Sequence, residues 1–449
     1  MKKREFLAMG GAVPLVLAGC GGNGSGSAPV RLVNASVGYP LGLGFMVEST
    51  QETTADVLYG AASPFINVQA GAVGITLTVS NKSATAAQVR TIAKDTRYSL
   101  VTYGFSNELR FALVTESTIV PDAGKANVNV LDTSADIGAV DVYLSATADL
   151  SNPTQIASNL VANSSSPSQT AFAGILAGTY FITVVGFDSV RQGISDVRFQ
   201  SPTAVTLTAL QVLTIILTPG ASGVLANAIL LTQGTASGAP VNLPNTTARI
   251  RAVTSTGGKA AAVAGVLAST TSSQYSNYVV VTTGAPPAVT VNGAAVTPFM
   301  NVKDATTGVV TQQAATLLAG GDYTMMVYVD GSGNPIAQLI EDNNTAPVLT
   351  QGAKFRLVNL AYNNQGLQLS MSVNSISIAS LIPYGTASDY TEISTPQTIN
   401  SVAEVFDGTD LLTQHSQLMT LGNIFTDFVT SVDPTTGVAK DIFRAASGA

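Results

Sequence analysis

Arg31-Leu32-Val33-Asn34 recurs 325 positions later as Arg356-Leu357-Val358-Asn359. At the same offset, and without a gap, Tyr59-Gly60-Ala61-Ala62-Ser63 corresponds to Tyr384-Gly385-Thr386-Ala387-Ser388. Two motifs that keep a separation of 28 residues in both copies indicate an internal repeat, because chance rarely preserves both residues and spacing. This pair of motifs therefore predicts a chain built from repeated modules.

Two weaker copies of the opening stretch lie between these, at Ala126-Asn127-Val128 and at Ala248-Arg249-Ile250. The four starts give repeats of about 95–120 residues, which is the size of an immunoglobulin-like sandwich of seven to nine strands. We therefore expect four β-sandwiches, at residues 30–118, 125–233, 246–345 and 354–449.

Short runs rich in β-branched and aromatic residues fill these modules. Tyr98-Ser99-Leu100-Val101-Thr102-Tyr103 is one example, and Gly, Pro, Asn and Asp separate such runs throughout the chain. Residues 259–267 are rich in alanine and allow a short helix, but Gly265 and the neighbouring valines weaken that alternative. The predicted fold class is all-β, with tandem immunoglobulin-like sandwiches.

Composition excludes several classes of function. Only 10% of the 449 residues are charged and the net charge is −7, with no basic cluster beyond residue 4, so nucleic-acid binding is not expected. The chain has one His and one Cys, which leaves too few ligands for a Cys/His zinc site and too few groups for a thiol–imidazole enzyme. We expect no cofactor and no metal.

The N-terminus carries an export signal. A basic start at residues 2–4 precedes the apolar stretch 6–17, which is shorter than the roughly 20 residues that span a bilayer. Leu17-Ala18-Gly19-Cys20 then resembles the bacterial lipoprotein box. The resemblance implies a signal peptide over 1–19, cleavage between Gly19 and Cys20, and lipid attachment at Cys20.

Residues 20–29 are rich in Gly and Ser and are expected to form a flexible linker. Gly21 follows the lipid-bearing Cys20 where an Asp would favour retention in the inner membrane, so the resemblance to Gram-negative lipoproteins implies the outer membrane. Lys3-Arg4 also leaves a twin-arginine export route open. The expected partners are the membrane, through the lipid, and an envelope protein that the sequence does not identify.

Candidate catalytic residues are few. His415 is the only imidazole and no Gly-x-Ser-x-Gly motif accompanies it, so a structural role is favoured over a serine triad. The acidic residues, among them Asp132 and Asp141, mostly lie beside turn-forming residues that a carboxylate can cap. We expect no catalytic residue, and the sequence indicates no ligand-binding residue.

Two oxygen-rich segments are candidate calcium sites. Neither Asp330-Gly331-Ser332-Gly333-Asn334 nor Glu341-Asp342-Asn343-Asn344 has the alternating acids and distal Glu of a helix–loop–helix site. The first segment is better explained as a hairpin turn.

The repeated motifs contain two residue types that can bind ligands. Arg31 and Arg356 are expected to lie on a solvated face, or to pair with a carboxylate while their stems cover apolar surface. Tyr59 and Tyr384 are expected to be corner tyrosines whose hydroxyls bond to the backbone.

These motifs together resemble a known family, the bacterial domain of unknown function 4397. The resemblance rests on the Arg-Leu-Val-Asn opening, an Asp-Val-Tyr strand, the Tyr-Gly-x-x-Ser-x-aromatic motif and an Ala-Gly…Tyr-Thr hairpin. It is best over 30–115 and 354–395, fair over 126–232 and poor over 248–340. It implies exported β-sandwich repeats, often on lipoproteins, and implies no activity.

The sequence therefore favours an exported, lipid-anchored cell-envelope protein with a non-catalytic structural or protein-binding role. The alternative is a carbohydrate- or small-ligand-binding adhesin or receptor, although 6% aromatic residues and the absence of Trp offer little stacking surface for sugars. An acid-only hydrolase would need two carboxylates about 5–10 Å apart in a cleft.

Overall fold

The chain forms four β-sandwiches in the computed structural model, and the only helical element among the described residues is a single 3-10 turn, η1 (Ala135–Ile137). The all-β prediction is confirmed. The structure describes residues 26–53, 56–104, 109–163, 166–187, 196–234, 239–304, 306–345, 347, 352–395, 400–419, 423–433 and 435–445. Cys20 and the predicted signal peptide lie outside these residues. Within them, no helix has the length and apolar character that crossing a bilayer requires.

Each sandwich contains two sheets. The strands of the first sandwich are β1 (Ser27–Asn34), β2 (Gly44–Val47), β3 (Thr50–Gln51), β4 (Ile66–Gln69), β5 (Gly71–Val79), β6 (Lys82–Ser83), β7 (Gln88–Ile92), β8 (Tyr98–Tyr103) and β9 (Arg110–Thr115). Those of the second are β10 (Lys125–Asp132), β11 (Val140–Ser145), β12 (Thr154–Leu160), β13 (Ser168–Gln169), β14 (Ala173–Leu176), β15 (Gly178–Gly186), β16 (Val197–Gln200), β17 (Val205–Leu207), β18 (Val212–Pro219), β19 (Ala226–Thr232) and β20 (Val241–Leu243).

The other two sandwiches follow the same plan. The strands of the third are β21 (Thr247–Ser255), β22 (Ala261–Val263), β23 (Leu267–Thr270), β24 (Val279–Thr282), β25 (Val289–Val291), β26 (Ala294–Val296), β27 (Phe299–Lys303), β28 (Val310–Ala314), β29 (Asp322–Val329) and β30 (Pro335–Asp342). Those of the fourth are β31 (Gly352–Asn359), β32 (Leu369–Val373), β33 (Ile376–Ile382), β34 (Thr386–Ala387), β35 (Thr391–Ser394), β36 (Ser401–Asp407), β37 (Asp410–Gln417), β38 (Ile424–Val432) and β39 (Ala439–Ala445).

Some of these bounds differ from the expected ones. β1 begins inside the stretch 20–29 that was expected to be linker, and β20 extends the second sandwich beyond residue 233 because it pairs with β19. The alanine-rich stretch 259–267 contains β22 and the start of β23, so the helical alternative is wrong.

A parallel strand pair lies at the centre of one sheet in every sandwich. The pairs are β1 with β8, β10 with β18, β21 with β29, and β31 with β38. The opening motif lies on the first strand of such a pair: Arg31 lies opposite Ser99, and Arg356 lies opposite Thr426. The four pairs place equivalent residues in the same register, so the sandwiches can be compared position by position.

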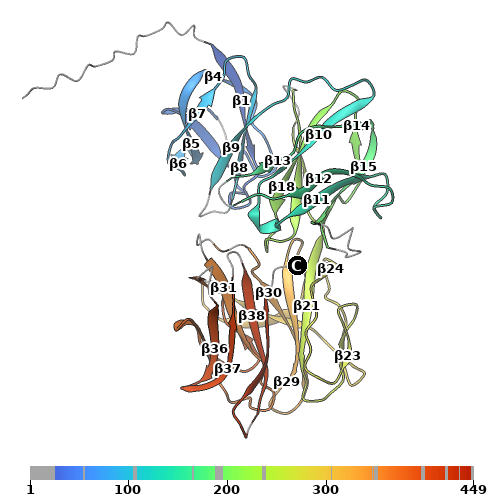
Figure 1. The fold of residues 1–449 in the computed structure, drawn as a ribbon, viewed down its shortest axis with the longest axis vertical. Helices are drawn as coiled ribbons and strands as arrows, with labels where there is room; N and C mark the ends of the chain where they lie inside the picture. Colours follow the sequence, from blue (N-terminus) through green and yellow to red (C-terminus); the bar gives the residue numbers. More distant parts are fainter. Residues whose placement is uncertain are drawn as a thin grey trace, which may run out of the picture.

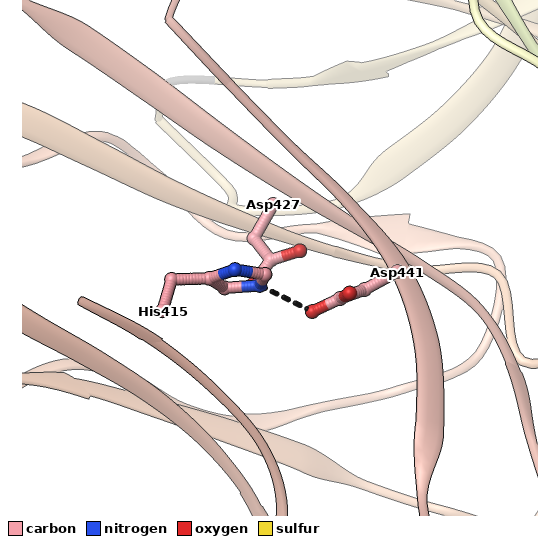
Figure 2. Close-up of side chains that lie close together, drawn as sticks. All are labelled: His415, Asp427 and Asp441. Atoms are coloured by element: carbon pink, nitrogen blue, oxygen red, sulfur yellow. Dashed lines mark hydrogen bonds and ion pairs between the residues drawn. The ribbon is translucent and has the colours of Figure 1, made fainter. Parts of the chain in front are cut away.

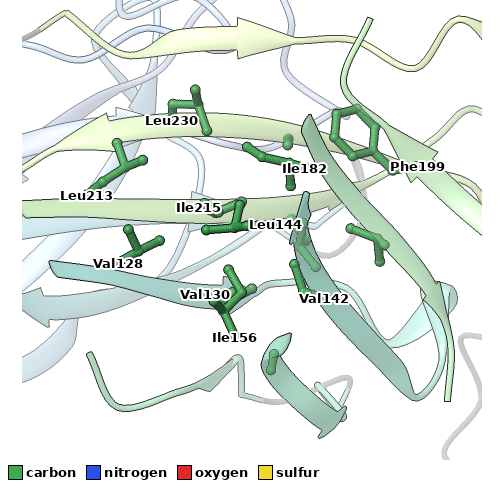
Figure 3. Close-up of a cluster of buried hydrophobic side chains, with 14 of the residues drawn as sticks. Val128, Val130, Val142, Leu144, Ile156, Ile182, Phe199, Leu213, Ile215 and Leu230 are labelled. Carbon is green, nitrogen blue, oxygen red and sulfur yellow. The ribbon is translucent and has the colours of Figure 1, made fainter. Parts of the chain in front are cut away.

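The central strands are buried on both faces. Along β31, for example, every residue is buried, although a sandwich standing alone would expose alternate residues of the strand to solvent. The inner face packs on the core of its own sandwich, shown for the second sandwich in Figure 3. The outer face therefore needs a second covering, and the neighbouring sandwich supplies it.

Sandwiches 1 and 2 pack face to face, and so do sandwiches 3 and 4 (Figure 1). Between the first two, Val33 and Val101 meet Leu131 and Ile216; between the last two, Met326 meets Phe428. Fully burying one such side chain contributes about 1.5–3 kcal/mol, so each interface adds a second core to the pair.

The two pairs meet where sandwich 2 contacts sandwich 3. Ser222 Oγ accepts a hydrogen bond from the Asp322 amide at 2.9 Å, and the Ser222 amide donates to the Gly320 carbonyl at 3.1 Å. Gly320 has a φ of +75°, and a Cβ on the facing Gly220 would lie 3.2 Å from the Gly320 backbone and 2.6 Å from the Leu225 oxygen of its own sandwich, so glycine suits both positions.

Candidate functional site

The arginine of the opening motif is buried in the interface between sandwiches. Arg31 is 2% exposed, and its Nη2 lies 2.6 Å from the Glu116 carboxylate while its Nε donates to Ser99 Oγ at 2.9 Å. Nη2 also donates to the Thr232 carbonyl of sandwich 2 at 3.0 Å, and the guanidinium lies over the Phe65 ring at 4.7 Å. Arg31 therefore joins two sandwiches.

Arg356, its counterpart in sandwich 4, reaches into sandwich 3. Its Nη2 contacts Asp342 Oδ1, and its Nη1 donates to the Glu341 carbonyl at 3.1 Å. Arg251 occupies the equivalent position of sandwich 3, and its Nε lies 3.3 Å from Asp342 Oδ2. Its Nη2 donates to Thr426 Oγ1 of sandwich 4 at 3.3 Å. One buried carboxylate thus lies between two guanidiniums from different sandwiches.

The hydrogen bonds around Asp342 hold it ionised. Tyr278 donates to its Oδ2 at 2.5 Å and Thr324 donates to the same oxygen at 2.6 Å. Burial raises the pKa of Asp342, but the charges of Arg251 and Arg356, together with these two hydrogen bonds, outweigh burial and hold that pKa below its ordinary value. The expectation that Arg31 and Arg356 pair with carboxylates is confirmed, and the alternative of a solvated face is wrong, because both are at most 3% exposed.

Aromatic rings lie against the arginines of this region, which outnumber its carboxylates. Arg249 binds Asp322 through two hydrogen bonds of 2.8 and 2.6 Å, so three guanidiniums face two carboxylates in this region. Arg249 lies 4.5 Å from the Tyr278 ring centre, and Arg356 lies 4.4 Å from that of Tyr390. Such contacts are favourable for a desolvated cation, so the rings compensate the third arginine in part.

The Tyr-Gly-x-x-Ser motif also serves the interface. Tyr59 Oη lies 2.7 Å from Thr218 Oγ1 of sandwich 2, and Tyr384 Oη donates to the Val329 carbonyl of sandwich 3 at 2.6 Å. The backbone partner expected for these hydroxyls is therefore found for Tyr384, whereas Tyr59 binds a side chain.

The glycine of the motif marks the closest approach of the neighbour. Gly60 and Gly385 have φ values of +77° and +73°. An added Cβ would lie 2.9 Å from Asn242 in the first case and 2.9 Å from Tyr328 in the second. The final serine of the motif, Ser63 or Ser388, accepts a hydrogen bond from an amide of the opening strand of its own sandwich. One turn therefore contacts both that strand and the neighbouring sandwich.

We predict that Tyr384→Phe weakens the contact between sandwiches 3 and 4 by about 1 kcal/mol, because it removes one hydrogen bond and keeps the ring. Hydrogen exchange of peptides across the β29–β30 turn should become faster. Tyr180→Phe is the matched control, since its hydroxyl bonds to Leu176 inside its own sandwich. Equal effects of the two changes would contradict the interface role.

A groove opens where sandwiches 2, 3 and 4 meet. Its volume is about 940 Å³, and its wall includes Ser222, Met300, Lys303, Arg356 and Tyr390. Acidic and basic side chains both line it, so it suits a polar ligand rather than an apolar one. The Arg356 guanidinium and the Asp342 carboxylate on its wall already bind each other.

His415, the only histidine, lies beside two carboxylates that the sequence did not single out (Figure 2). Its Nε2 is 2.6 Å from Asp441 Oδ2 and 3.9 Å from Asp427 Oδ2. His415 is on β37 in one sheet of sandwich 4, whereas Asp427 on β38 and Asp441 on β39 belong to the other sheet. All three side chains point into the space between the sheets, at the edge formed by β37 and β39.

Asp427 is the unusual member of this cluster. It is fully buried, and neither carboxylate oxygen accepts a hydrogen bond from any residue that the structure describes. Burial and the nearby Asp441 charge raise its pKa to about 8. The pKa of His415 is raised, mainly by its hydrogen bond to Asp441.

The sequence contained a signal for Asp427. It interrupts the apolar strand Ile424–Val432, and Phe425 and Val429, two positions away on either side, belong to the core of sandwich 4. Because side chains alternate along a strand, Asp427 must face that core. Asp441 carried no comparable signal, because its position depends on pairing with Val429 across the sheet.

Gly19 and Cys20 lie outside the described residues, so cleavage and lipid attachment remain predictions. Asp330 accepts hydrogen bonds from the Ser332 and Asn334 amides between β29 and β30, which confirms the hairpin turn.

Asp132 caps a turn from a buried position. Its oxygens accept hydrogen bonds from the amides of Ser134 at 3.0 Å and Ala162 at 3.3 Å. Burial raises its pKa to about 7, with a smaller contribution from Asp136, whereas these two hydrogen bonds and, less strongly, Arg198 oppose the rise. The folded sandwich therefore holds a proton that the unfolded chain releases above about pH 4.

We predict that this carboxyl makes sandwich 2 less stable as pH rises from about 4 to about 7, by up to about 1.4 kcal/mol per pH unit, and that it adds no further change above pH 7. In Asp132→Asn this part of the pH dependence should disappear. Hydrogen exchange of peptides from β10, corrected for the intrinsic pH dependence of exchange, measures the difference in slope between the two proteins. Parallel slopes would contradict the assignment.

Comparison with known proteins identifies part of the chain. Residues 28–143 match the family model described as "Domain of unknown function (DUF4397)". The matched stretch covers the first sandwich and the opening strands of the second, which confirms the resemblance seen there in the sequence. The resemblance over 354–395 stays a prediction. No curated protein matches the chain.

Proposed function

We propose that the protein is an exported, lipid-anchored component of the cell envelope, with a non-catalytic structural or protein-binding role. The lipoprotein-like box at Cys20 and the linker after it support the anchoring. Gly21, in the place where an Asp would favour the inner membrane, supports sorting to the outer membrane. The four sandwiches would then stand on the membrane as a stiff body.

The observation that carries the structural role is the use of the repeated motifs. Arg31 and Tyr59 bind the neighbouring sandwich, and so do Arg356 and Tyr384. Residues that recur in both copies are thus committed to contacts within the chain, which favours a spacer or scaffold over an enzyme. Asp342, the most strongly bound carboxylate of the groove, is engaged by two arginines, Tyr278 and Thr324.

Membrane fractionation tests the anchoring. The protein should be recovered with outer-membrane lipoproteins of a Gram-negative host, Cys20→Ala should be released into the soluble fraction, and Gly21→Asp should move to the inner membrane. A Cys20→Ala protein that stays membrane-bound would overturn the anchor.

Small-angle scattering of Cys20→Ala in solution tests the stiff body. The scattering curve should fit the two packed pairs of Figure 1 with one conformation. A curve that requires four independently moving sandwiches would overturn the structural role. Cross-linking in intact envelopes would then identify the protein that the scaffold holds.

The groove favours one alternative, a polar small-ligand or carbohydrate receptor. Binding on a glycan array that is lost when Lys303→Ala alters the groove wall would support this role. Binding that persists in that variant would assign the ligand to another surface.

A further inference from the structure

We propose that His415 Nε2 and one carboxylate oxygen from each of Asp427 and Asp441 bind a divalent transition-metal ion of the zinc class. The site would connect the two sheets of sandwich 4 at their open edge. It goes beyond the role proposed above and does not depend on it.

The first observation is the position of Asp427. Asp427 lies on the second strand of the parallel pair in sandwich 4. The residues at the equivalent position of the other three sandwiches are Leu100, Ile215 and Met325. All three are fully buried apolar residues. Sandwich 4 places a carboxylate at a position that the shared fold fills with a hydrophobic side chain. The fold therefore does not require Asp427.

The second observation is that the Asp427 carboxylate lacks the hydrogen bonds that normally accompany burial. Both oxygens are enclosed without a donor among the described residues, and the nearest cationic group, His415, is 3.9 Å away. A buried polar group in this condition costs about 1–3 kcal/mol, more when it is charged. A bound cation would supply the missing electrostatic partner.

The third observation is geometric. The three ligand atoms all lie within 4.8 Å of one another. Two ligands of a tetrahedral zinc ion, at about 2.0–2.2 Å from the metal, lie roughly 3.4 Å apart. The 2.6 Å contact between His415 and Asp441 must widen and the 3.9 Å contact with Asp427 must shorten, each by less than about 1 Å. The Asp427 and Asp441 oxygens lie within 4.8 Å of each other, so this third separation must shorten by at most about 1.4 Å.

The ligand types select the metal. Imidazole nitrogen suits zinc and its neighbours, whereas calcium and magnesium prefer all-oxygen sites. The imidazole is also held in place, because the Phe443 ring stacks on it at 4.7 Å and Phe425 stacks on Phe443 at 5.2 Å. An apolar wall of this kind orients the ligand and limits water at the site. With three protein ligands, the partly exposed His415 side leaves one position open to solvent.

Calorimetric titration of Zn²⁺ into the untagged chain carrying Cys20→Ala tests the proposal. A tag is left out because the chain has a single histidine, and Cys20 is replaced because its thiol would compete for zinc. We expect one zinc ion per chain, with a dissociation constant in the micromolar range or tighter. Calcium and magnesium should bind at least 100-fold more weakly. Cobalt should give the visible absorption of a site with fewer than six ligands.

Two variants assign the ligands and one controls for surface acids. Asp427→Leu restores the residue type of the other sandwiches and should fold, and His415→Gln changes a partly exposed side chain; each should weaken zinc binding at least 100-fold. Asp410→Asn, an exposed acid at the start of the same strand as His415, should bind zinc like the parent protein. No zinc binding by the parent, equal binding by Asp427→Leu, or equal affinity for calcium would overturn the proposal.

Discussion

Asp342→Asn is expected to weaken the joint between sandwiches 3 and 4 by about 3–5 kcal/mol. The carboxylate is fully buried and lies between Arg251 and Arg356. Asparagine keeps the shape and one acceptor oxygen but removes the negative charge. The guanidiniums of Arg251 and Arg356, which are at most 3% exposed, then lose their shared counter-charge and keep only the Tyr278 and Tyr390 rings as compensating contacts.

Hydrogen exchange measures this effect, because a chain of four sandwiches has no single free energy of unfolding. Peptides from β31 and β21, on the two sides of the joint, should exchange much faster in the variant. Peptides from β1 in sandwich 1 should not change.

A surface ion pair provides the matched control. Lys125 and Asp122 lie 3.0 Å apart, and their side chains are 39% and 78% exposed. Exposed pairs contribute at most about 1 kcal/mol, so Asp122→Asn should leave exchange nearly unchanged. If Asp342→Asn has no larger effect than this control, the buried carboxylate does not hold the joint together.

The sequence predicted the sandwiches but not their pairing. Runs such as Tyr98-Ser99-Leu100-Val101-Thr102-Tyr103 indicate strands, and the absence of strict alternation in them is typical of strands buried on both faces. That pattern indicates that the outer face of the sheet is covered, but it does not identify the residues that cover it. The covering residues of β8, Leu131 and Ile216 among them, come from another module, and no local pattern connects them.

The same limit applied to the site. The opening arginines could be recognised as repeated, but the partner of Arg356 is Asp342, which the sequence offered only as part of a weak calcium segment. His415 was correctly recognised as the only imidazole. Its carboxylate neighbours come from two strands of the opposite sheet, so the cluster depends on how the sheets stack. Of its members, Asp427 alone could have been found by testing each strand for a polar residue facing the core.

Asp427→Leu is expected to stabilise metal-free sandwich 4 by about 2 kcal/mol. The change removes a buried carboxyl group whose oxygens have no hydrogen-bond partner among the described residues, a deficit that costs about 1–3 kcal/mol, and buries an apolar side chain in its place. Leucine is larger than aspartate, and the strain of fitting it subtracts from that gain. The equivalent Leu100 is fully buried in sandwich 1, so the fold accommodates this residue.

Asp427→Asn is the matched control for this change. An amide at position 427 has as few hydrogen-bond partners as the wild-type group, so the control should gain less stability than the leucine variant. Hydrogen exchange of peptides from β38, measured with a chelator present, should be slowest for the leucine variant, with the asparagine variant close to the wild type. A leucine variant that exchanges faster than the wild type would show that the carboxylate supports the core.

Adding zinc should change this ranking. A metal that binds only the folded state stabilises it by about 2.7 kcal/mol at a free concentration 100 times the dissociation constant. The wild type gains this stabilisation and Asp427→Leu does not. With zinc, sandwich 4 of the wild type should therefore be at least as stable as that of the variant. Asp427 would then destabilise the core of sandwich 4 without metal and stabilise it with metal. Metal binding would explain why a polar residue occupies this otherwise apolar position. If sandwich 4 of the leucine variant remains more stable than that of the wild type by the same free energy at saturating zinc, metal binding does not explain the aspartate at position 427.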